Sequence, residues 1–235
     1  MNKSVFTILT LLAAVFAFAV SAENHKINEY VTDVGQFTTL KVQDNVNVVY
    51  SCVPDSTAKV AYHGAPEFAN AFIITNSGNT LKIQVNTEDV GNPELPTIYI
   101  YSDFIKKVEN YSDFNITVNN PAPCPDFTAA LIGNGSITVN NLKATKVAAR
   151  ITAGNGRITL IGSCDEADFR MAGTGVIQAD ELRAKSVICK IVGGGTIGCD
   201  PAEFLKVGGL GSTRIYYRGN PKIKHTLGGK LIKID

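Results

Sequence analysis

A repeat of about 20 residues is the feature that most constrains what this chain can fold into. Five times in the second half, a short glycine-containing turn is followed at nearly constant distance by an isoleucine, and an earlier copy carries Ser112–Phe114 in place of the glycines. The isoleucines follow one another at intervals of 21, 21, 19, 20 and 18 residues. They are Ile116, Ile137, Ile158, Ile177, Ile197 and Ile215. A repeat of this length is typical of stacked coils.

The dimensions of a strand fit this interpretation. At about 3.3 Å per residue, one repeat supplies roughly 65 Å of extended chain, which closes a small flattened turn of two or three strands. Each isoleucine can then lie about 4.8 Å above its counterpart, so that the column forms the core. Glycine suits the sharp turns, because it adopts positive φ without strain. The leucine pattern of leucine-rich repeats and any sustained helical spacing are absent. The sequence therefore predicts an all-β fold, a parallel β-helix.

The first half predicts longer strands that cap one end of the solenoid. Val46–Tyr50 alternates as a half-buried strand does, and Asn76–Asn79 is a turn signal between two further strands. Pro66–Phe72 is compatible with one helical turn. We expect a single domain over residues 37–220, with a β-rich part at 37–96, glycine-punctuated coils at 97–220 and an end coil at 221–235.

Residues 1–22 have the pattern of a secretory signal peptide. Lys3 supplies the positive start, Val5–Val20 is almost wholly apolar, and small residues up to Ala22 provide a cleavage site. We expect Glu23 to begin the mature chain and residues 23–36 to be mobile. No later segment is apolar enough to cross a bilayer, so the mature chain should have no membrane span. The expected location is outside the cytoplasm, in the periplasm, at the outer-membrane surface or extracellular.

Composition argues against several functions. The net charge of +1 gives no case for nucleic acid. The three histidines have no metal-ligand spacing, and no catalytic or nucleotide-binding motif is present, so we expect no enzyme, metal or cofactor. An exported location permits disulfides, but an odd number of cysteines without C-x-x-C spacing favours small buried core residues. The cysteines are Cys52, Cys124, Cys164, Cys189 and Cys199.

Basic residues that precede the glycine turns are the first candidate site. Arg150, Arg170, Lys190 and Lys206 are spaced 20, 20 and 16 residues apart, and we expect them to stack into one stripe on an outer face. The stripe has two interpretations. Lysine and arginine keep outer faces soluble without any ligand. Alternatively, the stripe is an anion-binding face for an acidic glycan.

Aromatic and acidic residues give two further candidates. Tyr99, Tyr101 and Tyr111 offer flat rings that stack on sugars, although alternation should turn some of them inward. Asp165, Glu166 and Asp168 cluster in one expected loop and Asp180 and Glu181 in another, and the two loops are either a weak cation site together or solvated loop faces.

The order of the motifs resembles a known family. An F-x-x-L-x-V strand at Phe37–Val42, V-x-V at Val46–Val48, L-x-I at Leu81–Ile83 and then repeated G-x-G-x-I coils are similar to the family named putative auto-transporter adhesin, head GIN domain, of Bacteroidetes-type envelope proteins. The resemblance covers residues 37–219. It implies a right-handed, single-stranded β-helix with no catalytic residues and a largely unassigned activity.

Three functions follow as hypotheses. The first is a non-enzymatic, adhesin-like scaffold that binds a glycan or an envelope protein. The second is a carbohydrate-active enzyme, such as a polysaccharide lyase or glycosidase, which would require acids and a basic residue converging in a groove. The third is a partner in envelope signalling or stress. The oligomeric state is left open by the sequence.

Overall fold

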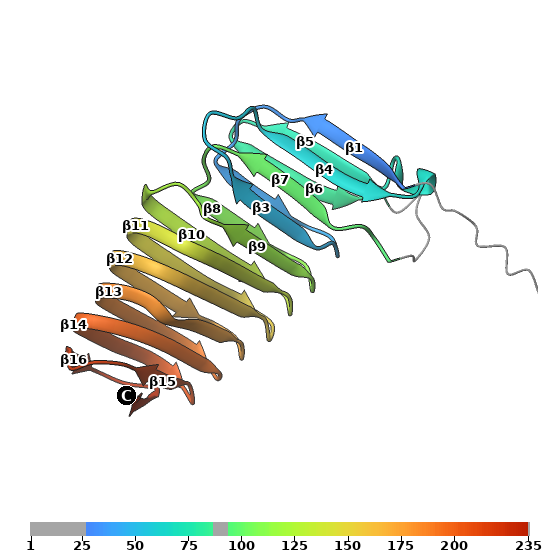
Figure 1. The fold of residues 1–235 in the computed structure, drawn as a ribbon. Coiled ribbons are helices and arrows are strands. Elements are labelled where there is room, and N and C mark those ends of the chain that lie inside the picture. Colours follow the sequence, from blue (N-terminus) through green and yellow to red (C-terminus); the bar gives the residue numbers. More distant parts are fainter. Residues whose placement is uncertain (1–26, 87–93, 235) are drawn as a thin grey trace, which may run out of the picture.

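The computed structural model describes residues 27–86 and 94–234, so the expected export signal lies outside the described residues. Strands dominate these ranges (Figure 1), with one 3-10 turn, η1, at Pro66–Phe68. The N-terminal strands are β1 (Asn28–Asp33), β2 (Thr39–Val42), β3 (Val48–Cys52), β4 (Lys59–Gly64), β5 (Phe72–Ser77), β6 (Thr80–Val85), β7 (Ile98–Ser102), β8 (Lys107–Asn110) and β9 (Asn115–Asn119). The later strands are β10 (Cys124–Ile132), β11 (Ser136–Ala153), β12 (Arg157–Met171), β13 (Val176–Gly193), β14 (Thr196–Gly211), β15 (Arg214–Tyr217), β16 (Lys222–His225) and β17 (Lys230–Lys233).

Each coil is a flattened loop with two long sides, which we name face A and face B. Face A contains β6, β2, β8, β10, the second halves of β11 to β14, and β16. Face B contains β7, β3, β9, the first halves of β11 to β14, and then β15 and β17. The long strands β11 to β14 run along face B and bend into face A of the next coil, in parallel register with their neighbours. The predicted β-solenoid of about 20 residues per coil is confirmed.

The isoleucines form one column inside face B, as predicted. Ile137 lies opposite both Ile116 and Ile158 in neighbouring coils, and the pairing continues without a slip to the last member. All six side chains have no exposed surface. A facing column inside face A completes the core with Ala129, Ala149, Phe169, Cys189 and Val207.

The glycine turns stack on each other as closely as the strands do. Gly154 has a φ of +90°, and a Cβ at this position would overlap the carbonyl oxygen of Gly133 in the preceding coil. Glycine is therefore required here for two reasons, the positive φ and the lack of space. Successive glycine turns thus pack backbone against backbone, without side chains between them. We call this side of the solenoid the turn edge.

The N-terminal coils stack out of sequence order. β2 lies between β6 and β8, and β3 lies between β7 and β9, so the first coil of the chain is enclosed by two later ones. Antiparallel β4 and β5 then continue faces B and A outward, and β1 pairs with β4 as the outermost strand. Figure 1 shows these strands at the N-terminal end. The predicted β-rich cap is present. Its strand order, in which two later coils enclose the first one, could not be predicted from local sequence patterns.

Residues 28–33 differ from the mobile segment expected over 23–36. They form β1, which pairs along its whole length with β4. Tyr30 stacks on Tyr62 at 4.9 Å between ring centroids, and the Tyr62 hydroxyl donates to the carbonyl oxygens of Phe68 and Ala69. The strand is ordered by these contacts with η1 and β4, which a short polar sequence does not reveal.

The C-terminal coil brings polar side chains into register with apolar residues of the preceding coil. Ile223 lies opposite the buried Leu205, whereas His225 lies opposite Val207 and Lys233 opposite Tyr217. His225 is 2.7 Å from the Gly228 carbonyl oxygen through Nε2, and the Lys233 ammonium donates to Asn220 Oδ1 at 2.6 Å. The coil expected over residues 221–235 therefore combines the apolar Ile223 and Leu231 with polar residues at its inward positions.

All five cysteines are free thiols. Four are buried, and Cys52 is partly exposed. Desolvation by burial raises the pKa of Cys164 to about 12, so this thiol stays protonated and poorly nucleophilic. Their role as small core residues matches the sequence interpretation. None of the helices within the described ranges has the length and hydropathy that crossing a membrane requires.

We predict that Gly154→Ala destabilises the fold by about 1–3 kcal/mol, because alanine is strained at this φ and its Cβ overlaps the preceding turn. Gly194→Ala is the matched control, because its φ is not positive and the nearest atom to a new Cβ lies 3.5 Å away. Urea unfolding of both variants measures the difference. Equal midpoints for the two variants would contradict the proposed role of the turn.

Candidate functional site

Three columns of outward-facing side chains cover face A, because parallel register places equivalent residues of successive coils side by side. The middle column has small residues at two levels, Thr128 and Ala148, which leave room between the outer columns. The columns are Asp126, Lys146, Glu166 and Ser186; Thr128, Ala148, Asp168 and Ile188; and Ala130, Arg150, Arg170 and Lys190.

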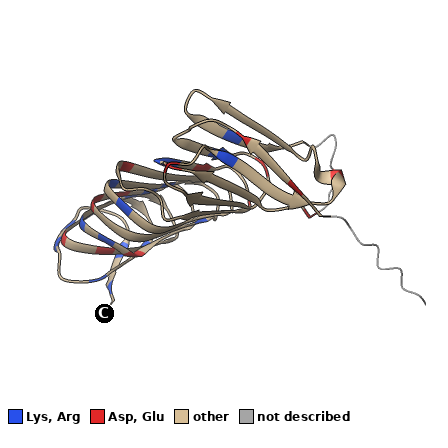
Figure 2. Ribbon diagram, turned by 45° about the horizontal axis from the view of Figure 1, so that its top comes forward, with Lys and Arg blue, Asp and Glu red and all other residues tan. Residues whose placement is uncertain are grey.

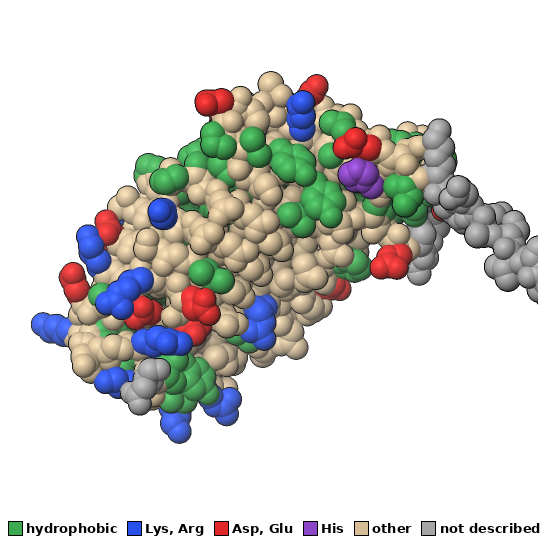
Figure 3. All heavy atoms as spheres, in the orientation of Figure 1, with side chains coloured by type: hydrophobic (Ala, Val, Ile, Leu, Met, Phe, Trp, Pro, Cys, Tyr) green, Lys and Arg blue, Asp and Glu red, His purple; other side chains and the backbone are tan. Residues whose placement is uncertain are grey.

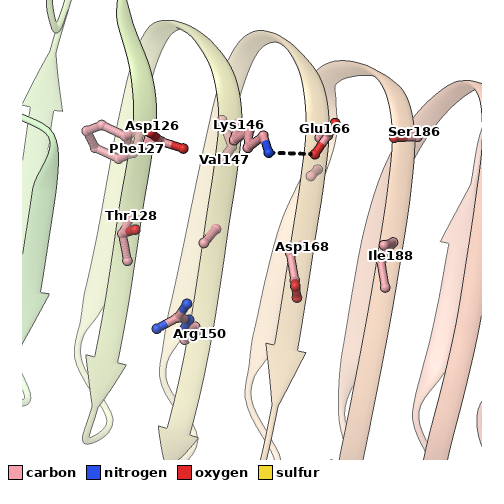
Figure 4. A pocket seen from close by; sticks show the side chains of 12 residues that line it. Asp126, Phe127, Thr128, Lys146, Val147, Arg150, Glu166, Asp168, Ser186 and Ile188 are labelled. Carbon is pink, nitrogen blue, oxygen red and sulfur yellow. Dashed lines mark ion pairs between the residues drawn. The ribbon is translucent and has the colours of Figure 1, made fainter.

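A shallow hollow of about 590 Å³ lies on these columns (Figure 4). Its floor includes Thr128 and Ala148, and its charged residues include Arg150, Glu166 and Asp168. A second hollow of about 400 Å³ shares Asp126 and Thr128 with the first and extends toward β8. The two hollows adjoin each other at Asp126 and Thr128 on face A.

Three of the four residues in the predicted basic stripe stand in one column. Arg150 lies opposite Arg170, and Arg170 lies opposite Lys190. Lys190 then lies opposite Gly208, while Lys206 lies opposite Ile188 in the neighbouring column. The cause is visible in the numbering, since neighbouring residues in these two coils are 18 apart and Lys206 follows Lys190 by only 16. The stripe is therefore Arg150, Arg170 and Lys190, with Lys206 displaced from it.

Asp168 stands among these cations. Its carboxylate accepts two hydrogen bonds from Arg170, each at 3.0 Å, and lies 3.8 Å from the Lys190 ammonium. The hydrogen bond from Arg170 holds the pKa of Asp168 below its usual value, with further help from the charges of Lys190 and Arg150. Two cations thus share one carboxylate, and the cluster keeps positive charge. Among the described residues, no ion pair or hydrogen bond occupies Arg150, which faces the hollow (Figure 4).

The acids of residues 165–168 do not converge on a common point. Asp165 pairs with Lys185 at 2.8 Å, and Glu166 pairs with Lys146 at 3.4 Å. Within the described ranges, no group of three potential metal ligands occurs. Acidic and basic positions are interspersed over the coils (Figure 2), which is the pattern of carboxylates engaged by neighbouring cations.

Three carboxylates line the hollow, Asp126 among them, and two of these, Glu166 and Asp168, stand on one strand. Both point outward from β12 into the hollow. A general acid at neutral pH needs a raised pKa, whereas the pKa of Asp168 is lowered. Fixed, paired charges of this kind suit recognition of a charged ligand better than proton transfer.

The tyrosines do not form one platform. Tyr99 and Tyr101 point outward from β7 on face B, each 37% exposed. Tyr111 follows β8 at the turn edge, and the Lys41 ammonium lies over its ring, 4.6 Å from the centroid. Only Tyr99 and Tyr101 share a surface, and it is not the face that carries the hollow.

Sequence reasoning missed the hollow and the neutralising role of Asp168. The hollow depends on small residues at one phase of successive coils, and Asp168 depends on lying two residues before Arg170 on the same strand. Both signals are present in the sequence once the repeat is aligned column by column instead of by its glycines alone.

Comparisons with known proteins agree with this architecture. The model of the family described as putative auto-transporter adhesin, head GIN domain, matches residues 36–221. Among solved structures, a putative adhesin from Bacteroides fragilis is similar at 21% identity and a TM-score of 0.77, covering 88% of this chain and 95% of that one. A putative lipid binding protein from Parabacteroides distasonis has 18% identity and a TM-score of 0.67, covering 90% and 98%. A putative adhesin from Parabacteroides merdae has 19% identity and a TM-score of 0.66, covering 89% and 96%. At these identities the similarity shows the fold. No curated protein matches the chain.

We predict that Asp168→Asn makes the fold less sensitive to acid. The lowered pKa of Asp168 means that its ionised form stabilises the fold above its unfolded-state pKa of about 4, and that this contribution is lost as the pH falls through the folded-state pKa. At neutral pH the variant should be less stable than the parent, because Arg170 and Lys190 lose their shared carboxylate. The difference in free energy of unfolding should shrink between pH 6 and about pH 3. A difference that stays constant over this range would contradict the assignment.

Proposed function

Because the chain belongs to the family of the auto-transporter adhesin head GIN domain, we propose that it is a non-enzymatic, adhesin-like solenoid that binds an extended acidic glycan along face A. The observation that carries the proposal is the in-register column of Arg150, Arg170 and Lys190 beside the hollow. Since coils repeat about every 4.8 Å, the cations recur at a regular spacing along the axis. A polymer with regularly repeated carboxylate or sulfate groups matches such a column.

The basic column, rather than the whole lining of the hollow, supports an anionic ligand, because the lining combines Asp126, Glu166 and Asp168 with the two cations Lys146 and Arg150. Arg150 is available to such a ligand, and Asp168 neutralises only part of the charge of Arg170 and Lys190. Asp168 also reduces the repulsion between stacked cations, which would otherwise weaken the sheet. Asp168 thus stabilises the column when no ligand is bound, and the column keeps positive charge with which it can bind an anionic ligand.

Two further features belong to the proposal. Tyr99 and Tyr101 form a separate exposed pair on face B, where their rings can stack on sugar faces. The signal expected at residues 1–22 places the mature chain in the periplasm, at the outer-membrane surface or outside the cell. An envelope location would bring the solenoid into contact with acidic polysaccharide.

We predict that the purified protein is retained on an immobilised acidic polysaccharide at low salt, and not on a neutral dextran. Replacing Arg150, Arg170 and Lys190 with Gln should lower the salt concentration of elution, because three cations are lost from face A, one of them, Arg150, in the hollow. The matched control removes three exposed cations from one outer column of face B with Arg157→Gln, Arg214→Gln and Lys230→Gln. Thermal unfolding checks that both triple variants keep the fold.

The control decides between a specific face and general attraction. If the two triple variants elute at the same salt concentration, the column on face A has no special role and the proposal fails. Release of unsaturated or reducing sugar ends from the polysaccharide by the parent protein would instead support the enzymatic alternative.

A further inference from the structure

Both ends of the solenoid have strands that pair along one side only. In the described part of the chain, β1 pairs only with β4 and β5 only with β6 at the N-terminal end. At the C-terminal end, β16 pairs only with β14 and β17 only with β15. An unpaired edge presents backbone N–H and C=O groups that another strand can pair with. Among residues 27–86 and 94–234, the two ends of the solenoid therefore have unpaired strand edges that differ in sequence.

The two edge strands of face B, β1 and β17, carry opposite charge, and within the N-terminal end His63 of β4 lies 3.7 Å from Glu29. Residues 204–234 contain seven lysines and arginines and no aspartate or glutamate. Figure 3 shows basic side chains gathered around the C-terminal end. The outermost N-terminal strand, β1, contains Glu29 and Asp33 and no basic residue. In a chain with a net charge of +1, this separation gives the solenoid an acidic N-terminal edge and a basic C-terminal end.

The side chains of the two edge strands of face B alternate in the same way. On β17, Leu231 lies opposite the buried Ile215 and faces inward, so Lys230 and Ile232 face outward. On β1, Tyr30 faces inward against Tyr62, so Glu29 and Val31 face outward. Val31 is 53% exposed and has no apolar cover. Each edge thus offers a charged residue and an aliphatic one on the outer surface.

We propose that the chain stacks head to tail with a second copy of itself, through parallel pairing of β17 with β1 of the next copy. Because β1 and β7 are both antiparallel to β4, β1 runs parallel to the other strands of face B, and a copy displaced along the axis presents it in the right direction. The pleat restricts the pairing to registers that differ by two residues. One register places Lys230 beside Glu29, Leu231 beside Tyr30, and Ile232 beside Val31.

The neighbouring registers lack this match. A shift of two residues in one direction places Lys230 beside Val31 and Ile232 beside Asp33. The opposite shift places Ile232 beside Glu29. Both bring an aliphatic side chain against a carboxylate, so the charges and the apolar residues select one alignment.

Charge also decides against contact between two C-terminal ends. Such a contact would bring Lys222, Lys224 and Lys230 of both copies together, and like charges on facing strands are unfavourable. Head-to-tail contact joins two different surfaces, so it adds further copies in an open series rather than closing at a dimer. On face A, β16 and β5 would remain apart, because only face B has the additional strand β1. The joint is therefore one strand pair, and we expect it to be weak and dependent on concentration.

The test is sedimentation velocity of the purified protein over a range of concentrations. The parent should form dimers and longer species at low salt, and less of them at high salt. Lys230→Glu and Glu29→Lys should each weaken self-association by about tenfold, because an opposite-charge pair becomes a like-charge pair. An equimolar mixture of the two single variants should associate again, since each then meets a partner end of opposite charge.

Recovery in the mixture separates the joint from any effect on folding, which mixing cannot repair. Lys143→Glu, the same charge change at a site distant from both ends, should associate like the parent. A parent protein that stays monomeric at all concentrations, or two single variants that do not associate when mixed, would overturn the proposal. Sedimentation with anionic phosphatidylglycerol vesicles by a monomeric parent would overturn it also, and would assign the basic end to a lipid surface.

Discussion

The parallel register between successive coils is the constraint on which the rest of the structure depends. It is fixed by the inner isoleucine column, since a slip of one residue would turn Ile158 and its counterparts outward and charged residues inward. It is fixed again at the turn edge, where Gly154 lies directly against the backbone of Gly133. Two independent sets of contacts thus define the same alignment, which makes every coil a template for the next.

The same register determines what the outer surface can do. Stacking gives each outer residue a neighbour of the same phase about 4.8 Å away, so a repeated cation becomes a column of cations. Such a column is unfavourable without carboxylates nearby, and Asp168 beside Arg170 supplies one. The hollow on face A follows from the same rule, because Ala148 lies next to Thr128 in one column. A ligand that repeats along its own length suits this surface better than a small compact one.

The features of the fold and the site that could be predicted from the sequence are those that arise from the repeat. The isoleucine spacing predicts the coil, the core column and the glycine edge, because these depend on short-range repetition. It does not predict that β2 lies between β6 and β8, since that order depends on long-range pairing which no local pattern encodes. For the site, the spacing of Arg150, Arg170 and Lys190 was sufficient, whereas Lys206 was misplaced by counting from a glycine turn in a coil that is two residues shorter. The sequence did not predict that residues 28–33 form the strand β1, because the stabilising contact of this strand, Tyr30 with Tyr62, joins residues 32 apart.

The parallel stacking of similar coils changes at both ends of the described solenoid, and it changes differently at each end. At the N-terminal end the strand direction reverses in β4 and β5, so the parallel template is interrupted while the core stays covered by Tyr62 and Phe72. At the C-terminal end the direction persists, but the exposed side chains of His225 and Lys233 lie in register with the apolar Val207 and Tyr217 of the preceding coil. Polar groups at these positions oppose the addition of another apolar coil, while the backbone edge of β17 stays unpaired. An end that rejects a further coil of its own kind, but keeps an open edge and outward lysines, favours a partner strand with carboxylates.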